Sequence, residues 1–199
     1  PSYNGALLDA PNVAGDVYEG CYNKDGGVVN DTWDRWANES NGLLVIAAHH
    51  SKAICMSEVN PTPANRICTM ASWWMTYSEP YSIMAPLSPT PDGFTVLPEY
   101  DIVPRQPRAT AASDVRVLRS STGAYVREFA ACYQAGAPIG PCATVVNPST
   151  SGTVSMPQFS GSYAHALVVD DRSAYTGGTA QWTGAVPAQL GPASAVVLR

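Results

Sequence analysis

Residues 125–133 read YVREFAACY, a run rich in aromatic and β-branched residues that is typical of a strand. The chain after Pro104 contains further short runs of this kind, separated by residues that favour turns. They span residues 114–120, 143–148, 152–157, 165–171, 179–184 and 194–199. Short strands at this spacing predict antiparallel pairing, so we expect residues 105–199 to form a small antiparallel β-sandwich domain.

The first half of the chain has a different pattern. Residues 31–40 (DTWDRWANES) place Trp33 and Trp36 at helical spacing, and residues 64–78 form a second helical segment. Between them, residues 43–48 (LLVIAA) are a continuous apolar run of strand length, as expected of a strand buried on both faces. The strand-like run DVYEG (16–20) precedes these segments, which gives the order strand, helix, buried strand, helix. This order is typical of a parallel α/β unit, so the expected fold class is α/β followed by all-β.

Composition and charge limit the kind of partner. The 199 residues are 45% hydrophobic with five tryptophans, enough for a substantial core. Charged residues make up only 14% of the chain and the formal net charge is -5, so there is no basic footprint for nucleic acid and no polybasic membrane anchor. No apolar run approaches the roughly 20 residues of a membrane span. We expect a neutral partner.

Four of the five cysteines fall into two locally spaced pairs. Cys55 with Cys68, and Cys132 with Cys142, each enclose a proline-containing loop that a disulfide would brace, which leaves Cys21 over. Metal binding is the competing explanation, but neither pair has the close spacing of a zinc site, so we expect no metal and no cofactor.

Two sequence patterns fit the asparagine glycosylation motif. They begin at Asn30 and at Asn38, and with the paired cysteines they indicate an extracellular or secreted protein.

Several segments resemble a known family. They are NGALLDAPNVAGDVYEGCY (4–22), LPEYDIVP (97–104), GAYVREFAACY (123–133) and ATVVNPSTSGTVSMP (143–157). Together they are similar to the C-terminal part of secreted glycoside-hydrolase-like (β/α)8 barrel proteins of the hypothetical glycosyl hydrolase type, which close with a β-sandwich. The resemblance implies that residues 1–104 are the C-terminal portion of a (β/α) barrel and that the missing strands lie in a longer chain or in a second chain.

The resemblance directs attention to carboxylates. Glu19 ends the strand-like run DVYEG (16–20), where a barrel enzyme keeps its reacting groups. Glycoside hydrolysis normally takes two carboxyl groups, so Asp9 and Glu99 are the candidates for the second. The alternative is that Glu19 is an ordinary solvated acid at a strand end, that Asp9 caps a turn, and that Glu99 bonds to backbone amides.

Other side chains are candidates for contacts with a sugar. His49 and His50 end the LLVIAA run, and at most one of them would point into a barrel mouth. Trp33, Tyr22 and Trp74 could stack on sugar rings, although an aromatic stripe at helical spacing is usually buried.

Two functional classes follow. The first is a secreted glycoside hydrolase, or a fragment of one, that acts on a polysaccharide or oligosaccharide through carboxylate catalysis. The second is a non-catalytic extracellular structural or carbohydrate-binding protein. Fold resemblance alone does not choose between them.

Overall fold

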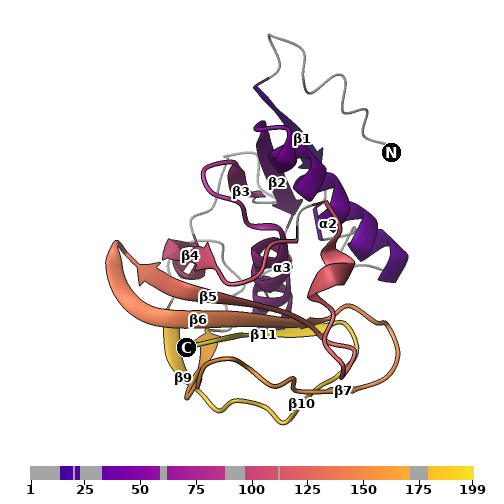
Figure 1. The fold of residues 1–199 in the computed structure, drawn as a ribbon. Coiled ribbons are helices and arrows are strands. Elements are labelled where there is room, and N and C mark those ends of the chain that lie inside the picture. Colours follow the sequence, from indigo (N-terminus) through magenta and orange to yellow (C-terminus); the bar gives the residue numbers. More distant parts are fainter. Residues whose placement is uncertain are drawn as a thin grey trace.

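A computed structural model describes residues 14–19, 21–22, 33–58, 62–87, 97–111, 113–170 and 179–199. Its largest sheet is antiparallel and has the strand order β4-β5-β6-β11-β8-β9 (Figure 1). These strands span Ile102–Pro107 (β4), Tyr125–Gln134 (β5), Ala137–Asn147 (β6), Ala166–Val169 (β8), Ala180–Gly184 (β9) and Ser194–Leu198 (β11).

The hairpin of β5 and β6 is the centre of this sheet. Its two-residue turn, Ala135 and Gly136, has positive φ at both positions (48° and 79°). That geometry belongs to the type I′ turn, whose twist matches the twist of the flanking strands. The disulfide between Cys132 and Cys142 joins the two strands, as the sequence predicted.

Each face of the antiparallel sheet has its own cover. Helix α3 (Pro63–Thr76) packs on one face against β11, β6 and β5. Its buried Trp74 meets Phe129 of β5 edge to face, with the ring centroids 5.7 Å apart. A smaller apolar cluster fills the other face, where the two-stranded sheet of β7 (Val154–Ser155) and β10 (Gln189–Leu190) lies.

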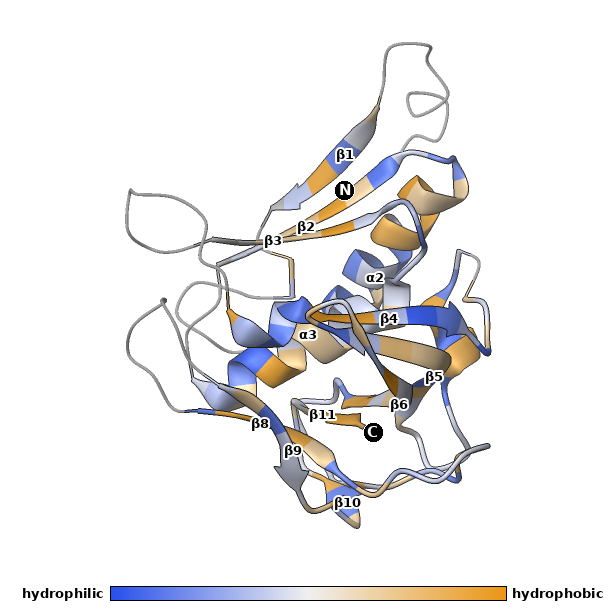
Figure 2. Ribbon diagram, turned by 90° about the vertical axis from the view of Figure 1, so that its left-hand side faces the viewer, coloured by the Kyte–Doolittle hydropathy of each residue, from blue (hydrophilic) through white to orange (hydrophobic). Residues whose placement is uncertain are grey.

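The second sheet is small, parallel and open, with the order β1-β2-β3. Its strands span Gly15–Glu19 (β1), Lys52–Glu58 (β2) and Ser82–Leu87 (β3). Helix α2 (Trp33–Ala48) covers the face that carries the buried residues Ala53 and Cys55 of β2. Val17 and Ile83 belong to one cross-strand row and are 46% and 39% exposed. Figure 2 shows the apolar residues along these strands.

The predicted fold class, a partial (β/α) barrel followed by a small antiparallel β-sandwich, is wrong, and so is the resemblance to the barrel family. The structure is predominantly β, and its parallel strands form an open three-stranded sheet. The LLVIAA run, expected as a buried strand, is the second half of α2. That half is apolar on most sides because the sheet, α3 and the short 3₁₀ helix η2 (Val115–Leu118) all pack on α2.

Strands β2 and β3 were not among the predicted elements. In β2 the buried face alternates through Ala53, Cys55 and Ser57, which are too small or too polar to make an obvious strand pattern. Residues 114–120, expected as a strand, contain η2, and Glu99 lies in a second 3₁₀ helix, η1 (Pro98–Asp101).

The core joins the two halves of the chain. Trp36 of α2 donates its Nε1 hydrogen to Ser72 of α3 at 3.0 Å, and its ring lies 4.7 Å from the ring of Tyr125 in β5. One buried cluster therefore draws on residues from both sides of residue 104. The division into domains 1–104 and 105–199 stays a prediction.

The predicted pairing of Cys55 with Cys68 is wrong. Cys55 of β2 bonds instead to Cys21, which follows β1, so this disulfide ties the two neighbouring parallel strands together. Cys68 is a buried free thiol on α3 and faces the carbonyl oxygen of Ala193 at 3.8 Å. Cys55 and Cys68 are close in sequence, which suggested a disulfide across a short loop. The fold instead places them in different layers, on β2 and on α3.

The disulfides bear on the cellular location of the protein. The two disulfides are compatible with an extracellular protein. Within the described residues, no helix is both long enough and apolar enough to cross a membrane. Of the two glycosylation motifs, Asn38 is exposed on α2, whereas Asn30 lies outside the described residues.

Candidate functional site

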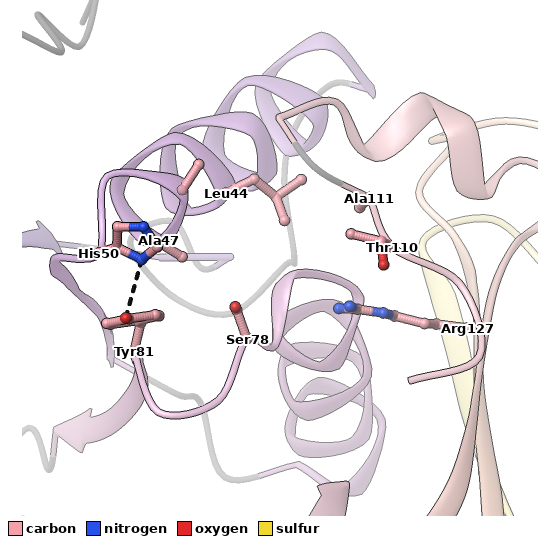
Figure 3. Close-up of a pocket in the computed structure, with 9 residues that line it drawn as sticks. Leu44, Ala47, His50, Ser78, Tyr81, Thr110, Ala111 and Arg127 are labelled. Atoms are coloured by element: carbon pink, nitrogen blue, oxygen red, sulfur yellow. Dashed lines mark hydrogen bonds between the residues drawn. The ribbon is translucent and has the colours of Figure 1, made fainter. Parts of the chain in front are cut away.

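A cavity of about 290 Å³ lies where α2, α3 and β5 come together (Figure 3). Its walls come from the end of α2, the loop after α3, the segment after β4, and β5. The lining residues are Leu44, Ala47, Ala48, His50, Ser78, Tyr81, Thr110, Ala111 and Arg127. The leucine and alanines make an apolar wall, and the other five side chains bring the polar groups.

The end of α2 places His50 at the rim. The backbone amide of Ser51 donates to Ile46 and that of His50 donates to Ala47, at 3.2 and 3.0 Å. This pair of bonds is a Schellman motif, whose C′ residue takes a left-handed conformation. His50 fills the position with φ of 58°, where glycine would be free of strain. The helix end thus fixes the direction in which the imidazole leaves the backbone.

Tyr81 completes the rim opposite His50. Its hydroxyl lies 3.0 Å from the Nδ1 atom of His50, and the two rings are 5.5 Å apart. The loop after α3 holds Tyr81 because its amide donates to the carbonyl of Ser78 at 2.7 Å. Lys52 sits 5.8 Å from the centre of the Tyr81 ring, which adds a positive charge beside the aromatic group.

Arg127 enters the cavity from β5 and is only 3% exposed. Its Nη1 atom donates to the carbonyls of Trp74 and Met75, at 3.1 and 2.9 Å, in the last turn of α3. Its Nε atom donates to Ala109 at 3.3 Å. Arg127 therefore caps helix α3, where the exposed carbonyls and the helix dipole favour a cation.

The charge of Arg127 has no acidic partner within the described part of the chain. Burial alone lowers the pKa of Arg127 to about 10, so the guanidinium is still charged at neutral pH. The Nη2 atom donates to no residue that the structure describes. A buried guanidinium with a free donor at a cavity wall is a strong site for an oxygen acceptor.

Ser78 and Thr110 add two hydroxyl groups to the lining of the cavity. Figure 3 shows Ser78 and Thr110 on either side of the cavity, with Thr110 next to Arg127. Neither hydroxyl is bonded to another described residue. A hydroxyl group both donates and accepts, so these two positions suit ligands that carry hydroxyls of their own.

Glu99 is the one predicted carboxylate whose side chain the structure describes, and it does not line this cavity. Glu19 is the last residue of the parallel strand β1, at the strand end predicted for it, but its side chain is not among those described. Asp9 lies outside the described residues. Glu99 is 0% exposed and binds Arg66 through two bonds of 2.7 and 2.6 Å, which indicates a structural role.

Among the predicted sugar-contacting residues whose side chains the structure describes, only His50 lines the cavity. Tyr22 is fully buried and its hydroxyl bonds to Ser40 at 3.0 Å. Trp74 is core, and His49 is half-buried away from the lining. The side chain of Trp33 is not among those described.

Sequence reasoning missed Arg127, Ser78 and Thr110. They come from three separate segments, and no local spacing links them. The available signal was Arg127 itself, a charged residue that stands between the aromatic residues Tyr125 and Phe129 on one face of a predicted strand. Among the described residues no group of three metal-binding side chains occurs, and the expected lack of a cofactor stays a prediction.

Comparisons with known proteins give no family. A scan against protein-family models, a search of curated proteins and a search of solved structures each found no match.

Proposed function

We propose that this chain is an extracellular carbohydrate-binding protein and that the cavity beside Arg127 holds one sugar residue. The observation that carries the proposal is the convergence on one small cavity of an aromatic rim, a buried guanidinium and two hydroxyls that are not bonded to other described residues. Proteins bind sugars through this combination, because ring faces pack on aromatic groups while hydroxyls exchange hydrogen bonds with polar side chains.

The size of the cavity limits the ligand. Ligand pockets usually span roughly 300–1,000 Å³, and this one, at about 290 Å³, is at the small end. It suits a single ring, such as a monosaccharide or the terminal residue of a glycan. The described residues that line it bring no carboxyl group, whereas hydrolysis needs two. The lining therefore favours binding over cleavage.

The binding test titrates monosaccharides into the protein and measures the heat of binding by isothermal calorimetry. Tyr81→Ala removes the aromatic rim, and His50→Gly removes the imidazole while keeping a residue suited to the left-handed position. Each variant should weaken binding by about 3- to 10-fold, the worth of one hydrogen bond or ring contact. Tyr133→Ala is the matched control, because Tyr133 lies at a different cavity and should bind normally. Equal affinities for all four proteins would refute the proposal.

Glycoside hydrolysis is the second candidate, favoured by the position of Glu19 at the carboxyl end of a parallel strand. Activity on a polysaccharide that falls by orders of magnitude in Glu19→Gln, with the fold intact, would support it. A chain without hydrolytic activity, or a Glu19→Gln variant with full activity, would remove it.

A further inference from the structure

We infer that the sugar is acidic, and that Arg127 binds the carboxylate of a uronic acid in this cavity. The inference rests on the proposed function and adds the chemical class of the ligand. It begins with the position of Arg127, a cation that is only 3% exposed, lines the cavity, and has no acceptor for its Nη2 atom among the described residues.

Capping helix α3 uses only some of the hydrogen-bond donors of the Arg127 guanidinium. The carbonyls of Trp74, Met75 and Ala109 occupy Nη1 and Nε. These groups carry partial negative charge, equivalent to about half an elementary charge at a helix C-terminus, and leave part of the positive charge uncompensated. A residue needed only as a cap could be exposed, where solvation of the charge would cost less.

The surroundings reinforce the positive potential. Lys52 lies against Tyr81 at the rim, its Nζ atom donating to the carbonyl of Pro80 at 2.7 Å. Arg127 thus lines the cavity and Lys52 lies beside the rim residue Tyr81, and the described lining residues bring no anion. This local excess of positive charge stands out in a chain whose formal net charge is -5.

A uronate matches this arrangement group by group. Its carboxylate accepts from Nη2 of Arg127 in a charge-assisted hydrogen bond, the stronger kind. Its ring hydroxyls reach Ser78 and Thr110, and its ring lies toward Tyr81 and the apolar wall of α2. A neutral sugar fills the same space and leaves the guanidinium without its anion.

The test compares ligands of the same shape on the unaltered protein. Galacturonate should bind about tenfold or more tightly than its neutral methyl ester or galactose, and the difference should shrink as salt is added. Equal affinity for the three sugars would overturn the inference and leave the proposed function standing. Binding of none of them would overturn both. Acetate that binds as tightly as galacturonate would show a site for simple anions and would also overturn both.

Single-residue variants test whether the preference for galacturonate depends on Arg127. Arg127→Lys keeps a cation that can still donate to the end of α3, but loses the planar fork, so the preference for galacturonate should fall to near parity. Arg119→Lys is the control, an exposed arginine at another cavity, and should keep the full preference. If Arg127→Lys does not fold, Thr110→Val serves instead and should weaken galacturonate and galactose alike by about 3- to 10-fold. An unchanged preference in folded Arg127→Lys, or unchanged affinities in Thr110→Val, would contradict the assignment.

Discussion

Single residues in this protein owe their roles to what surrounds them more than to their type. Glu99 and Glu19 are both strand-flanking or loop glutamates in the sequence, and both are plausible catalysts there. The structure gives Glu99 a buried arginine, Arg66, which also donates to the carbonyl of Asp170 at 2.9 Å. Arg66 thereby ties α3 to η1 and to the end of β8.

Glu99→Gln should destabilise the fold strongly. It leaves the buried guanidinium of Arg66 without its negative partner, and breaking a buried pair in this way costs about 3–5 kcal/mol. Denaturant unfolding followed by fluorescence measures the change. Arg116→Gln, which breaks the surface pair with Asp114, should leave the midpoint almost unchanged. Equal effects of the two variants would mean that Glu99 is not a structural anchor.

Cys68 should be unreactive in the native protein. Burial raises the pKa of the Cys68 thiol to about 12, so almost no thiolate is present at neutral pH. Iodoacetamide should label Cys68 quickly only after unfolding, and mass spectrometry measures the two rates. Peptide mapping without reductant should recover the linked pairs Cys21–Cys55 and Cys132–Cys142. Recovery of a Cys55–Cys68 peptide, or fast labelling of Cys68 in the folded protein, would contradict this pairing.

Most strands of residues 105–199 were predictable from the sequence, whereas β2, β3 and the second half of α2 were not. The runs at 125–133, 165–171, 179–184 and 194–199 contain β5, β8, β9 and β11, because alternation of apolar and polar residues is a local property. The secondary structure of LLVIAA (43–48) could not be predicted from that run alone. A continuous apolar run suits a buried strand or a buried helix, and the helix prevailed because α2 began upstream and continued through the run.

The same limit applies to the candidate site. His50 was identified because it follows an apolar run, although its position depends on a helix end and not on a strand. Arg127 could be noticed in sequence only as a charge inside a strand. Its contact with the last turn of α3 joins residues more than 50 positions apart, so no spacing rule could predict it.

Strand β5 also anchors the segment before β8, and this contact depends on pH. Glu128 accepts hydrogen bonds from the amide and the hydroxyl of Ser160 and from the hydroxyl of Tyr163, at 2.8, 2.7 and 2.9 Å. Burial tends to raise the pKa of Glu128, but these hydrogen bonds outweigh burial, so the pKa lies below its ordinary value.

The stability that Glu128 contributes should therefore be present above the unfolded pKa of about 4.3 and be lost as the pH falls through the lower pKa of the folded state. Thermal unfolding between pH 7 and pH 3 should show a smaller acid-induced loss for Glu128→Gln than for the unaltered protein. Glu79→Gln, which changes an exposed glutamate in another part of the molecule, is the control variant. Identical acid profiles for Glu128→Gln and the unaltered protein would contradict the assigned hydrogen bonds.

At the scale of the whole molecule, two sheets of different kinds share one core. Helices α2 and α3 lie between them, and Arg127 crosses from the antiparallel sheet to the end of α3. The parallel sheet is small and has an exposed apolar row, so we expect the Cys21–Cys55 disulfide to contribute strongly to holding β1 beside β2.

Removing the two disulfides should have unequal effects. Cys21 and Cys55 are 34 residues apart, and a loop of that length predicts a stabilisation of about 3–4 kcal/mol. Cys132 and Cys142 are 10 apart, which predicts about 2–3 kcal/mol, within a hairpin that its turn already fixes. Calorimetric unfolding of the two double Cys→Ser variants should show the larger loss for the first. The reverse order would mean that the parallel sheet is held mainly by packing.

A crystal structure of the chain with galacturonate at saturating concentration tests whether the cavity between α2, α3 and β5 holds an acidic sugar. We expect one sugar ring in the cavity, with its carboxylate within hydrogen-bonding distance of Nη2 of Arg127 and its ring beside Tyr81. A cavity without sugar under those conditions, or a sugar held elsewhere on the molecule, would contradict it.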